Sequence, residues 1–218
     1  MKLDGIHHIT AITGDAVRNL DYYTRVLGLR LTAKTVNQDD PRVYHLFYGD
    51  ELARPGADLT FFEYPGAIRG RPGPGMIHRI VWRVGSEDAL EFWADRLDRE
   101  GSEVQSGGRC VRFADFEGLE HELVVDSSAD EPLSAEHPEI PADLALRGFE
   151  GVRAYSFHQE ATIVLLERLM GAAQDTDRRW EIRGDMRGGW IALDQAPIER
   201  GIQSAETVHH VAWGTTDA

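Results

Sequence analysis

A short apolar frame that recurs along the chain constrains the fold more than any other feature of the sequence. It reads IHHIT at residues 6–10 and VHHVA at residues 208–212, and in both copies two adjacent histidines are flanked by apolar residues. Related copies read IHRIV at 77–81 and FEGVR at 149–153. The copies are about 60 to 70 residues apart, which is typical of a chain built from repeated supersecondary units.

Three copies of the frame are followed by segments with helical periodicity, which span residues 15–28, 86–101 and 159–171. Each segment ends in glycine, the residue best suited to a left-handed position after a helix. In the first segment Leu20, Tyr23 and Leu27 fall on one face. Asp15 and Ser86 are predicted N-caps. Short β-rich stretches broken by turns follow each segment, so the predicted unit is β-α-β-β-β.

The predicted fold class is α+β, with repeated units that pair into half-open, cupped barrels. Gly/Pro-rich and polar linkers at 66–75 and 127–143 separate the first three units. The predicted divisions are unit 1, with the metal site, at 1–65; unit 2 at 76–126; unit 3 at 147–197; and the start of a fourth unit at 205–218. The fourth unit stops where its helix should begin, so we expect a truncated unit with an open sheet edge.

Charge and cysteine content exclude several classes of partner. With 23 basic and 37 acidic residues the formal net charge is -14, which disfavours nucleic acid and anionic membranes. The single cysteine, Cys110, cannot form an internal disulfide, and the N-terminal residues lack the apolar core of a signal peptide. We expect a cytoplasmic protein that binds a small molecule and could associate into a homo-oligomer through an open cup.

The sequence resembles a known family of metalloenzymes. The β-α-β-β-β repeat is similar to that of the vicinal oxygen chelate superfamily, in which two units form a cup around a divalent metal. More closely, IHHITAITGDA followed by YYTRVLGLRLTAKTVNQDDPRVYHLFYGD resembles the hydroquinone-type ring-cleaving dioxygenases. The resemblance covers essentially the whole chain, and the TVNQDDPRVYHLFYGD stretch is the most specific part of it.

The resemblance implies an Fe(II)-dependent dioxygenase that uses O₂ to open hydroquinone- or catechol-type rings. It assigns the second histidine of each pair, His8 and His210, as iron ligands. The first of each pair, His7 and His209, would position a ligand or transfer protons, and Thr10, on the strand face of His8, could reach substrate or oxygen. The third ligand is expected to be a glutamate in the fourth unit, which would complete a 2-His-1-carboxylate triad.

The repeat itself indicates which units could hold the metal. At the ligand position units two and three carry Arg79 and Gly151, neither of which supplies a side-chain ligand, whereas units one and four carry histidine. We therefore expect the strands of His8 and His210 to share one cup. The strands of Arg79 and Gly151 should share the other.

Other polar residues have weaker claims to the metal site. Glu63 ends the last strand of unit one and is a possible substitute for the missing carboxylate, whereas Glu122 belongs to the unit with Arg79. His45 and His121 lie in β-like stretches outside the repeated frame and are interpreted as structural.

Two other functions remain open for a chain with this pattern. One is a glyoxalase-like lyase or isomerase, which would use Zn or Ni and consume no O₂. The other is a metal-free module of the same fold that binds small aromatic compounds.

Overall fold

The computed structural model describes residues 2–215 and arranges them as three β-α-β-β-β units followed by one strand. The first unit contains β1 (Leu3–Thr13), α1 (Ala16–Asp21), the π-helical turn η1 (Tyr22–Val26), β2 (Arg30–Val36), β3 (Tyr44–Gly49) and β4 (Asp58–Glu63). The second contains β5 (Ile77–Val84), α2 (Glu87–Arg99), β6 (Gln105–Gly107), β7 (Cys110–Ala114) and β8 (Glu120–Val125). The third contains β9 (Phe149–Ser156), α3 (Gln159–Val164), the π-helical turn η2 (Leu165–Leu169), β10 (Ala173–Thr176), β11 (Arg179–Arg183) and β12 (Gly188–Gln195), and β13 (Val208–Thr215) follows.

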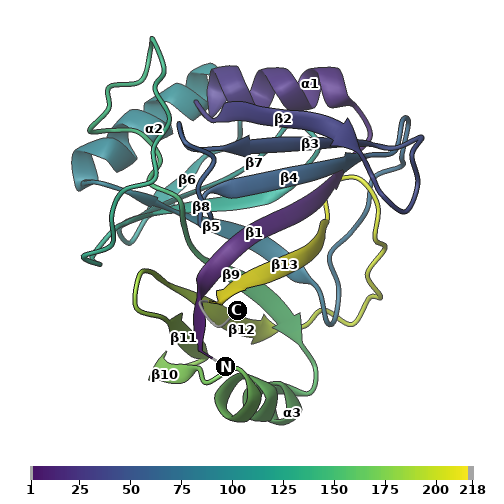
Figure 1. Ribbon diagram of the computed structural model, residues 1–218, viewed down its shortest axis with the longest axis vertical. Helices are drawn as coiled ribbons and strands as arrows, with labels where there is room; N and C mark the ends of the chain where they lie inside the picture. The colour runs from purple at the N-terminus through teal and green to yellow at the C-terminus, as the bar shows by residue number, and fades with distance from the viewer. Residues whose placement is uncertain (1, 216–218) are drawn as a thin grey trace.

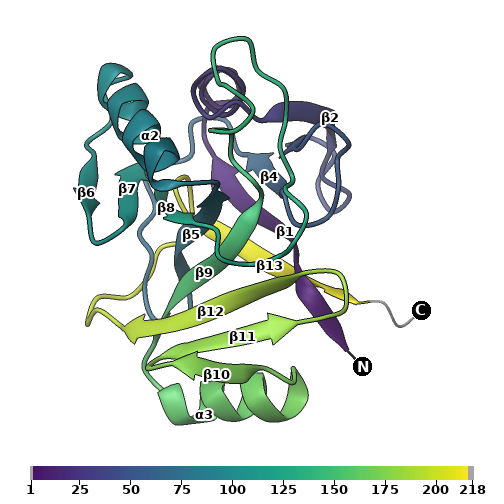
Figure 2. The ribbon, with the colours of Figure 1, turned by 90° about the vertical axis from the view of Figure 1, so that its left-hand side faces the viewer.

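The strands form two sheets, one from the first unit and β13 and the other from the second and third units. One sheet has five strands in the order β13-β1-β4-β3-β2, and the other has eight in the order β10-β11-β12-β9-β5-β8-β7-β6. Figure 1 shows α1 and α2 together at one end of the molecule and α3 at the other, with β1 and β13 in front of β9. Figure 2 shows β10, β11 and β12 beside α3. The predicted α+β class with paired units is confirmed.

Helix ends follow the local chemistry of the sequence. The side chain of Asp15 accepts hydrogen bonds from two backbone N–H groups at the start of α1, and Ser86 does the same for one N–H of α2. The glycines after the three helices, Gly28, Gly101 and Gly171, all have positive φ angles. Both predicted N-caps are therefore confirmed.

The predicted inner face of the first helix is only partly right. Tyr23 and Leu27 are fully buried, but Leu20 is 39% exposed. The buried stripe also contains Asn19, Tyr22 and Val26. Together with Tyr23 and Leu27 these residues follow the i, i+3, i+4, i+7, i+8 spacing of one helix face, and Leu20 lies at the edge of that face.

The principal hydrophobic core lies between the two sheets and the first two helices. Its large aromatic members include Tyr23, Trp82, Trp93 and Phe149, each at most 1% exposed. A smaller cluster around Trp180 packs α3 and η2 against the strands of the third unit. Within the described residues, no helix is long and apolar enough to span a membrane.

Candidate metal centre

The two doubled histidines meet because the first strand of the chain pairs with the last. β1 and β13 are antiparallel, with His8 opposite Ala212 and Thr10 opposite His210. Residues two apart on a strand share a face, so His8 and Thr10 point the same way, and His210 joins them from β13. The strands of the first and fourth copies of the frame, which we expected to share one cup, are thus neighbours in one sheet with their histidines converging.

The side chains of this group converge closely. The Nε2 atoms of His8 and His210 are 3.1 Å apart, and the hydroxyl of Thr10 lies 3.1 Å from Nε2 of His210. The outer histidine of each pair contacts its neighbour: Nδ1 of His7 is 3.0 Å from Nδ1 of His8, and Nδ1 of His209 is 2.8 Å from Nδ1 of His210. All five residues named from the sequence therefore lie in one cluster.

The Nδ1 contacts determine what the inner histidines can do. A neutral imidazole carries one N–H and one lone pair. In one tautomer, His8 carries its ring proton on Nδ1 and donates it to Nδ1 of His7. His210 in the same tautomer donates its Nδ1 proton to Nδ1 of His209. Both Nε2 atoms are then lone-pair donors that face one another. Histidines that bind metals commonly donate their other ring N–H in this way, which fixes the ring orientation.

The electrostatics of the cluster favour neutral rings. Burial is the main reason that the pKa of His8 is lowered to about 4, and repulsion from His210, His7 and His45 lowers it further. Partial desolvation, with a contribution from His209, also lowers the pKa of His210. Both rings are therefore neutral at pH 7, the form in which imidazole binds metals.

The separation of the two Nε2 atoms suits a shared metal ion. Two nitrogen ligands at about 2.1 Å from a metal and at right angles to one another are about 3.0 Å apart, close to the observed 3.1 Å between His8 and His210. Within residues 2–215, however, no group of three or more His, Cys, Asp or Glu side chains is placed to hold a metal ion. Within the described residues, the cluster therefore offers two converging histidines and no carboxylate.

The two glutamates considered from the sequence are engaged elsewhere. Glu63 accepts a hydrogen bond from the backbone N–H of Ala16 at 3.1 Å, at the start of α1. Glu122 accepts hydrogen bonds from Arg79 and Arg112 on the other sheet, each at 3.2 Å. Neither carboxylate belongs to the histidine cluster.

On the eight-stranded sheet, the two positions equivalent to His8 and His210 carry no side chain that binds metals. β5 and β9 pair antiparallel, as β1 and β13 do, and they carry Arg79 and Gly151. Arg79 forms an ion pair with Glu120 at 2.6 Å. A Cβ atom on Gly151 would lie 2.4 Å from the ring of Trp190, so this strand approaches its neighbour too closely for a side chain. The second predicted pairing is also confirmed.

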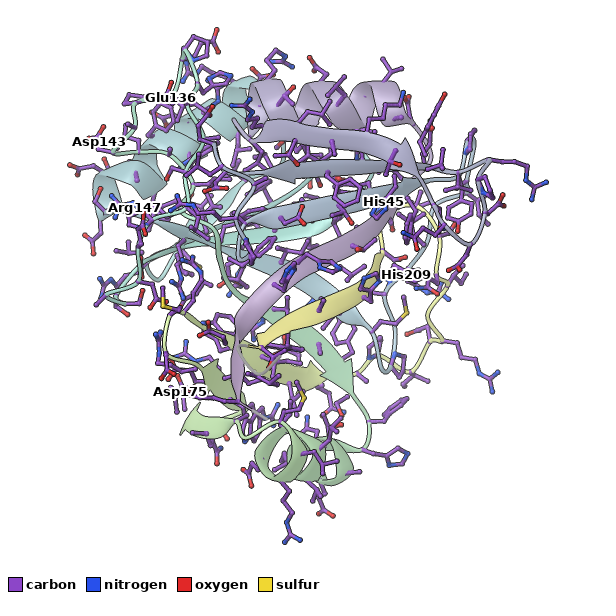
Figure 3. All side chains as sticks on the ribbon, in the orientation of Figure 1. His45, Glu136, Asp143, Arg147, Asp175 and His209 are labelled. Atoms are coloured by element: carbon purple, nitrogen blue, oxygen red, sulfur yellow. The ribbon has the colours of Figure 1, made fainter. Side chains whose placement is uncertain are left out.

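Two residues beside the cluster were not assigned to it from the sequence: His45 was interpreted as structural, and Asp58 was not considered. His45 on β3 donates to or accepts from the hydroxyl of Thr60 at 2.9 Å, and Thr60 in turn lies 2.8 Å from the hydroxyl of Thr10. Asp58 is in register with His8 on the neighbouring strand, and burial raises its pKa to about 6. No sequence motif marks either residue, because each comes near the cluster only through strand pairing. In Figure 3, His45 and His209 lie beside the ends of β1 and β13 that are far from both termini.

His121, in contrast, has the structural role expected for it. It is fully buried, and its ring nitrogens contact the indole N–H of Trp82 and the hydroxyl of Tyr23, each at 3.1 Å.

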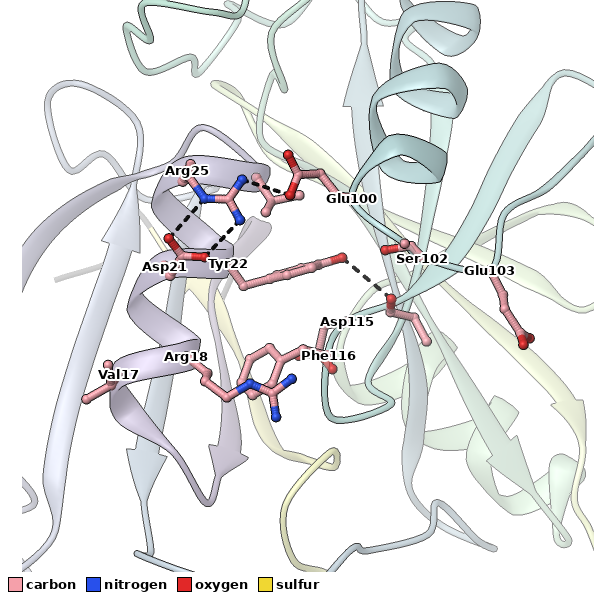
Figure 4. Close-up of a pocket in the computed structure, with 13 residues that line it drawn as sticks. Val17, Arg18, Asp21, Tyr22, Arg25, Glu100, Ser102, Glu103, Asp115 and Phe116 are labelled. Carbon is pink, nitrogen blue, oxygen red and sulfur yellow. Dashed lines mark hydrogen bonds and ion pairs between the residues drawn. The ribbon is translucent and has the colours of Figure 1, made fainter.

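A cavity of 720 Å³ lies away from the histidines, between α1, the end of α2 and β7. Figure 4 shows Arg25 at its rim, bound to Asp21 on its own helix and to Glu100 on the next unit. Arg18 lies over the ring of Phe116 on the same wall, at 4.6 Å. The guanidinium groups of Arg25 and Arg18 thus already interact with side chains of the protein itself. No histidine lines this cavity.

Comparison with known proteins agrees with this arrangement. Residues 5–112 match the Glyoxalase/Bleomycin resistance protein/Dioxygenase superfamily. A Bacillus subtilis protein named “Putative ring-cleaving dioxygenase MhqO” is 39% identical over 99% of this chain and 71% of its own length. The chain belongs to the glyoxalase/bleomycin resistance protein/dioxygenase superfamily.

Other members of the superfamily are similar in sequence and structure. A crystal structure described as a putative dioxygenase from Bacillus subtilis superposes with a TM-score of 0.89 at 39% identity, covering 97% of this chain and 70% of that one. A Sphingobium indicum protein named “Chlorohydroquinone/hydroquinone 1,2-dioxygenase” is 33% identical over 68% of this chain and 48% of its own length. The superposed crystal structure therefore shares the fold that brings the two histidine pairs of this chain together.

Proposed function

We propose that this superfamily member is an Fe(II)-dependent ring-cleaving dioxygenase that acts on hydroquinone- or catechol-type aromatics. The observation that carries the proposal is the 3.1 Å approach of the Nε2 atoms of His8 and His210, from strands at opposite ends of the chain. The similarity to relatives named ring-cleaving dioxygenases supports the same reaction class.

His8 and His210 would hold the metal through Nε2. Bound Fe(II) would supply a Lewis acid that lowers the pKa of a ring hydroxyl and a common binding place for substrate and O₂. Dioxygen is the oxidant in the net reaction: one carbon–carbon bond of the ring breaks, and the product retains both oxygen atoms.

The other residues of the cluster would act on protons and orientation. His7 and His209, which contact His8 and His210 through Nδ1, would hold those rings in place and act as general acid or base near the substrate. Thr10 is completely buried beside Nε2 of His210, where its hydroxyl can reach an oxygen atom of the substrate. The five-stranded sheet provides a rigid support for these groups.

The test is oxygen consumption by protein loaded anaerobically with Fe(II), using hydroquinone and chlorohydroquinone as substrates. We expect consumption of one O₂ per ring opened, and loss of activity in His8→Ala and His210→Ala but not in the matched control His158→Ala. His158 lies at the start of α3, outside the cluster. Conversion of a substrate by Zn- or Ni-loaded protein without O₂ uptake would identify a glyoxalase-like enzyme instead. Ligand binding that survives a chelator would identify a metal-free binding module.

A further inference from the structure

A continuous chain of side-chain hydrogen bonds connects His45 to the histidine cluster. It runs from Nε2 of His45 to the hydroxyl of Thr60 at 2.9 Å and on to the hydroxyl of Thr10 at 2.8 Å. It ends at Nε2 of His210, 3.1 Å from Thr10. Three adjacent strands, β3, β4 and β1, supply the first three members, and β13 supplies the last.

The two threonines in this chain are shielded from water. Thr10 is 0% exposed and Thr60 is 1% exposed. A hydroxyl has a single proton to donate, so a buried hydroxyl between two partners donates to one and accepts from the other. The direction of all the hydrogen bonds is therefore set by the groups at the two ends.

The tautomer of His210 sets that direction. When its Nδ1–H is donated to His209, Nε2 of His210 has only a lone pair, so the hydroxyl of Thr10 must be the donor in their contact. Thr10 then accepts from Thr60, and Thr60 accepts from His45. The proton of His45 consequently lies on Nε2.

The surroundings of His45 agree with a neutral, well-positioned ring. Its ring lies 4.0 Å from the ring of Phe47 and 4.4 Å from that of Phe62, measured between centroids. Burial, followed by repulsion from His210, lowers the pKa of His45 to about 4. A neutral imidazole has one N–H, and here that N–H is the one directed to Thr60.

We propose that His45 is a positioning residue that orients the hydroxyl of Thr10 as a hydrogen-bond donor towards oxygen ligands at the His8–His210 centre. This inference rests on the proposed metal site. Once a metal takes the lone pair of His210, Thr10 still accepts from Thr60, so its own O–H remains available as a donor. The nearest suitable acceptor is then an anionic oxygen of a bound phenolate or catecholate.

The first experiment determines the tautomer of His45 by ¹⁵N NMR in the metal-free and the Zn(II)-loaded protein. We expect a neutral ring protonated on Nε2 in both states, with a changed Nε2 shift in Thr60→Val. A ring protonated on Nδ1 would overturn the inference, since it would reverse every hydrogen bond in the chain. This measurement needs neither turnover nor iron, so it stands even if the proposed reaction is wrong.

The second experiment measures binding of 4-nitrocatechol, a coloured probe that binds as an anion, to Zn(II)-loaded protein. Thr60→Val removes the connecting hydroxyl with little change of shape, and we expect binding about tenfold weaker, in line with loss of one hydrogen bond to a charged group. Thr60→Ser and His45→Gln, which keep a hydroxyl and an N–H donor, should restore most of the affinity, whereas His45→Phe should not.

The control for this experiment is Thr13→Val, on the same strand as Thr10. Thr13 is equally buried, but its hydroxyl contacts the backbone of Asp15. We expect this variant to bind the probe like the wild-type protein. Equal affinity of Thr60→Val and wild type, at equal zinc content, would overturn the positioning role of His45. Failure of all variants and wild type to bind zinc would instead refute the proposed metal site, and the tautomer of His45 in the metal-free protein would still decide the direction of the hydrogen bonds.

Discussion

His121 should make the stability of the protein depend steeply on pH. The indole N–H of Trp82 can only donate, so Nδ1 of His121 must accept this hydrogen bond and carries no proton. Nε2 then carries the ring proton beside the hydroxyl of Tyr23, which donates to Asp115 at 2.8 Å. Protonating His121 would place two N–H groups against one another in a fully buried site, and burial accordingly lowers its pKa to about 3.

The expected size of the effect follows from proton linkage. An unfolded histidine titrates near pH 6.5, so between pH 6.5 and about 3 the unfolded chain binds a proton that folded His121 does not. The contribution to stability is therefore present above pH 6.5 and is lost as the pH falls. Between pH 7 and pH 5 the loss is about 2 kcal/mol, at 1.36 kcal/mol for each pH unit below the unfolded pKa.

The assay is urea unfolding of wild type and His121→Gln at several pH values from 7 to 5. Glutamine can accept from Trp82 and donate to Tyr23, but it does not titrate, so the free energy of unfolding should fall by about 2 kcal/mol less over this range than in wild type. Asp115 has a pKa raised by burial and the opposite pH dependence, but it is present in both proteins.

The control is Phe113→Leu, which removes the ring that stacks on His121 at 5.2 Å and leaves the histidine in place. This variant should be less stable than wild type at every pH while keeping the wild-type pH dependence. Equal pH dependence in wild type and His121→Gln would refute the reasoning.

Three further outcomes follow from the structure. His8→Ala and His210→Ala should each bind Fe(II) at least tenfold more weakly by elemental analysis after anaerobic loading and desalting, and stoichiometric iron in either variant would remove that residue from the ligand set. The guanidinium of Arg83 is 2% exposed and pairs with two carboxylates. Arg83→Met leaves both carboxylates without this partner, so it should lower the free energy of unfolding by about 3–5 kcal/mol. A loss below about 1 kcal/mol in urea unfolding would contradict this. Gly151→Ala places a methyl group against Trp190 and should lower the melting temperature, with a cost of about 1–3 kcal/mol. An unchanged melting temperature would show that the strands can separate to admit it.

Much of the fold could be predicted from the sequence because its signals are local. A side chain such as Asp15 or Ser86 caps a helix through N–H groups two or three residues away. The glycine that follows each helix adopts a left-handed backbone without reference to the rest of the molecule. The repeated frame also indicated which units pair, because only the first and last copies carry two histidines.

The surroundings of the histidine cluster depended on the tertiary structure. His45 joins the cluster because β3 pairs with β4 and β4 pairs in parallel register with β1, which brings Thr60 beside Thr10. A shift of one residue in either register would turn these side chains to the other face of the sheet. Glu63 ends the same strand as Thr60, yet its carboxylate binds the start of α1. The sequence determined which side chains each strand carries; the pairing of strands far apart in the chain decided which of them meet, because register is fixed by packing of the whole sheet against the core.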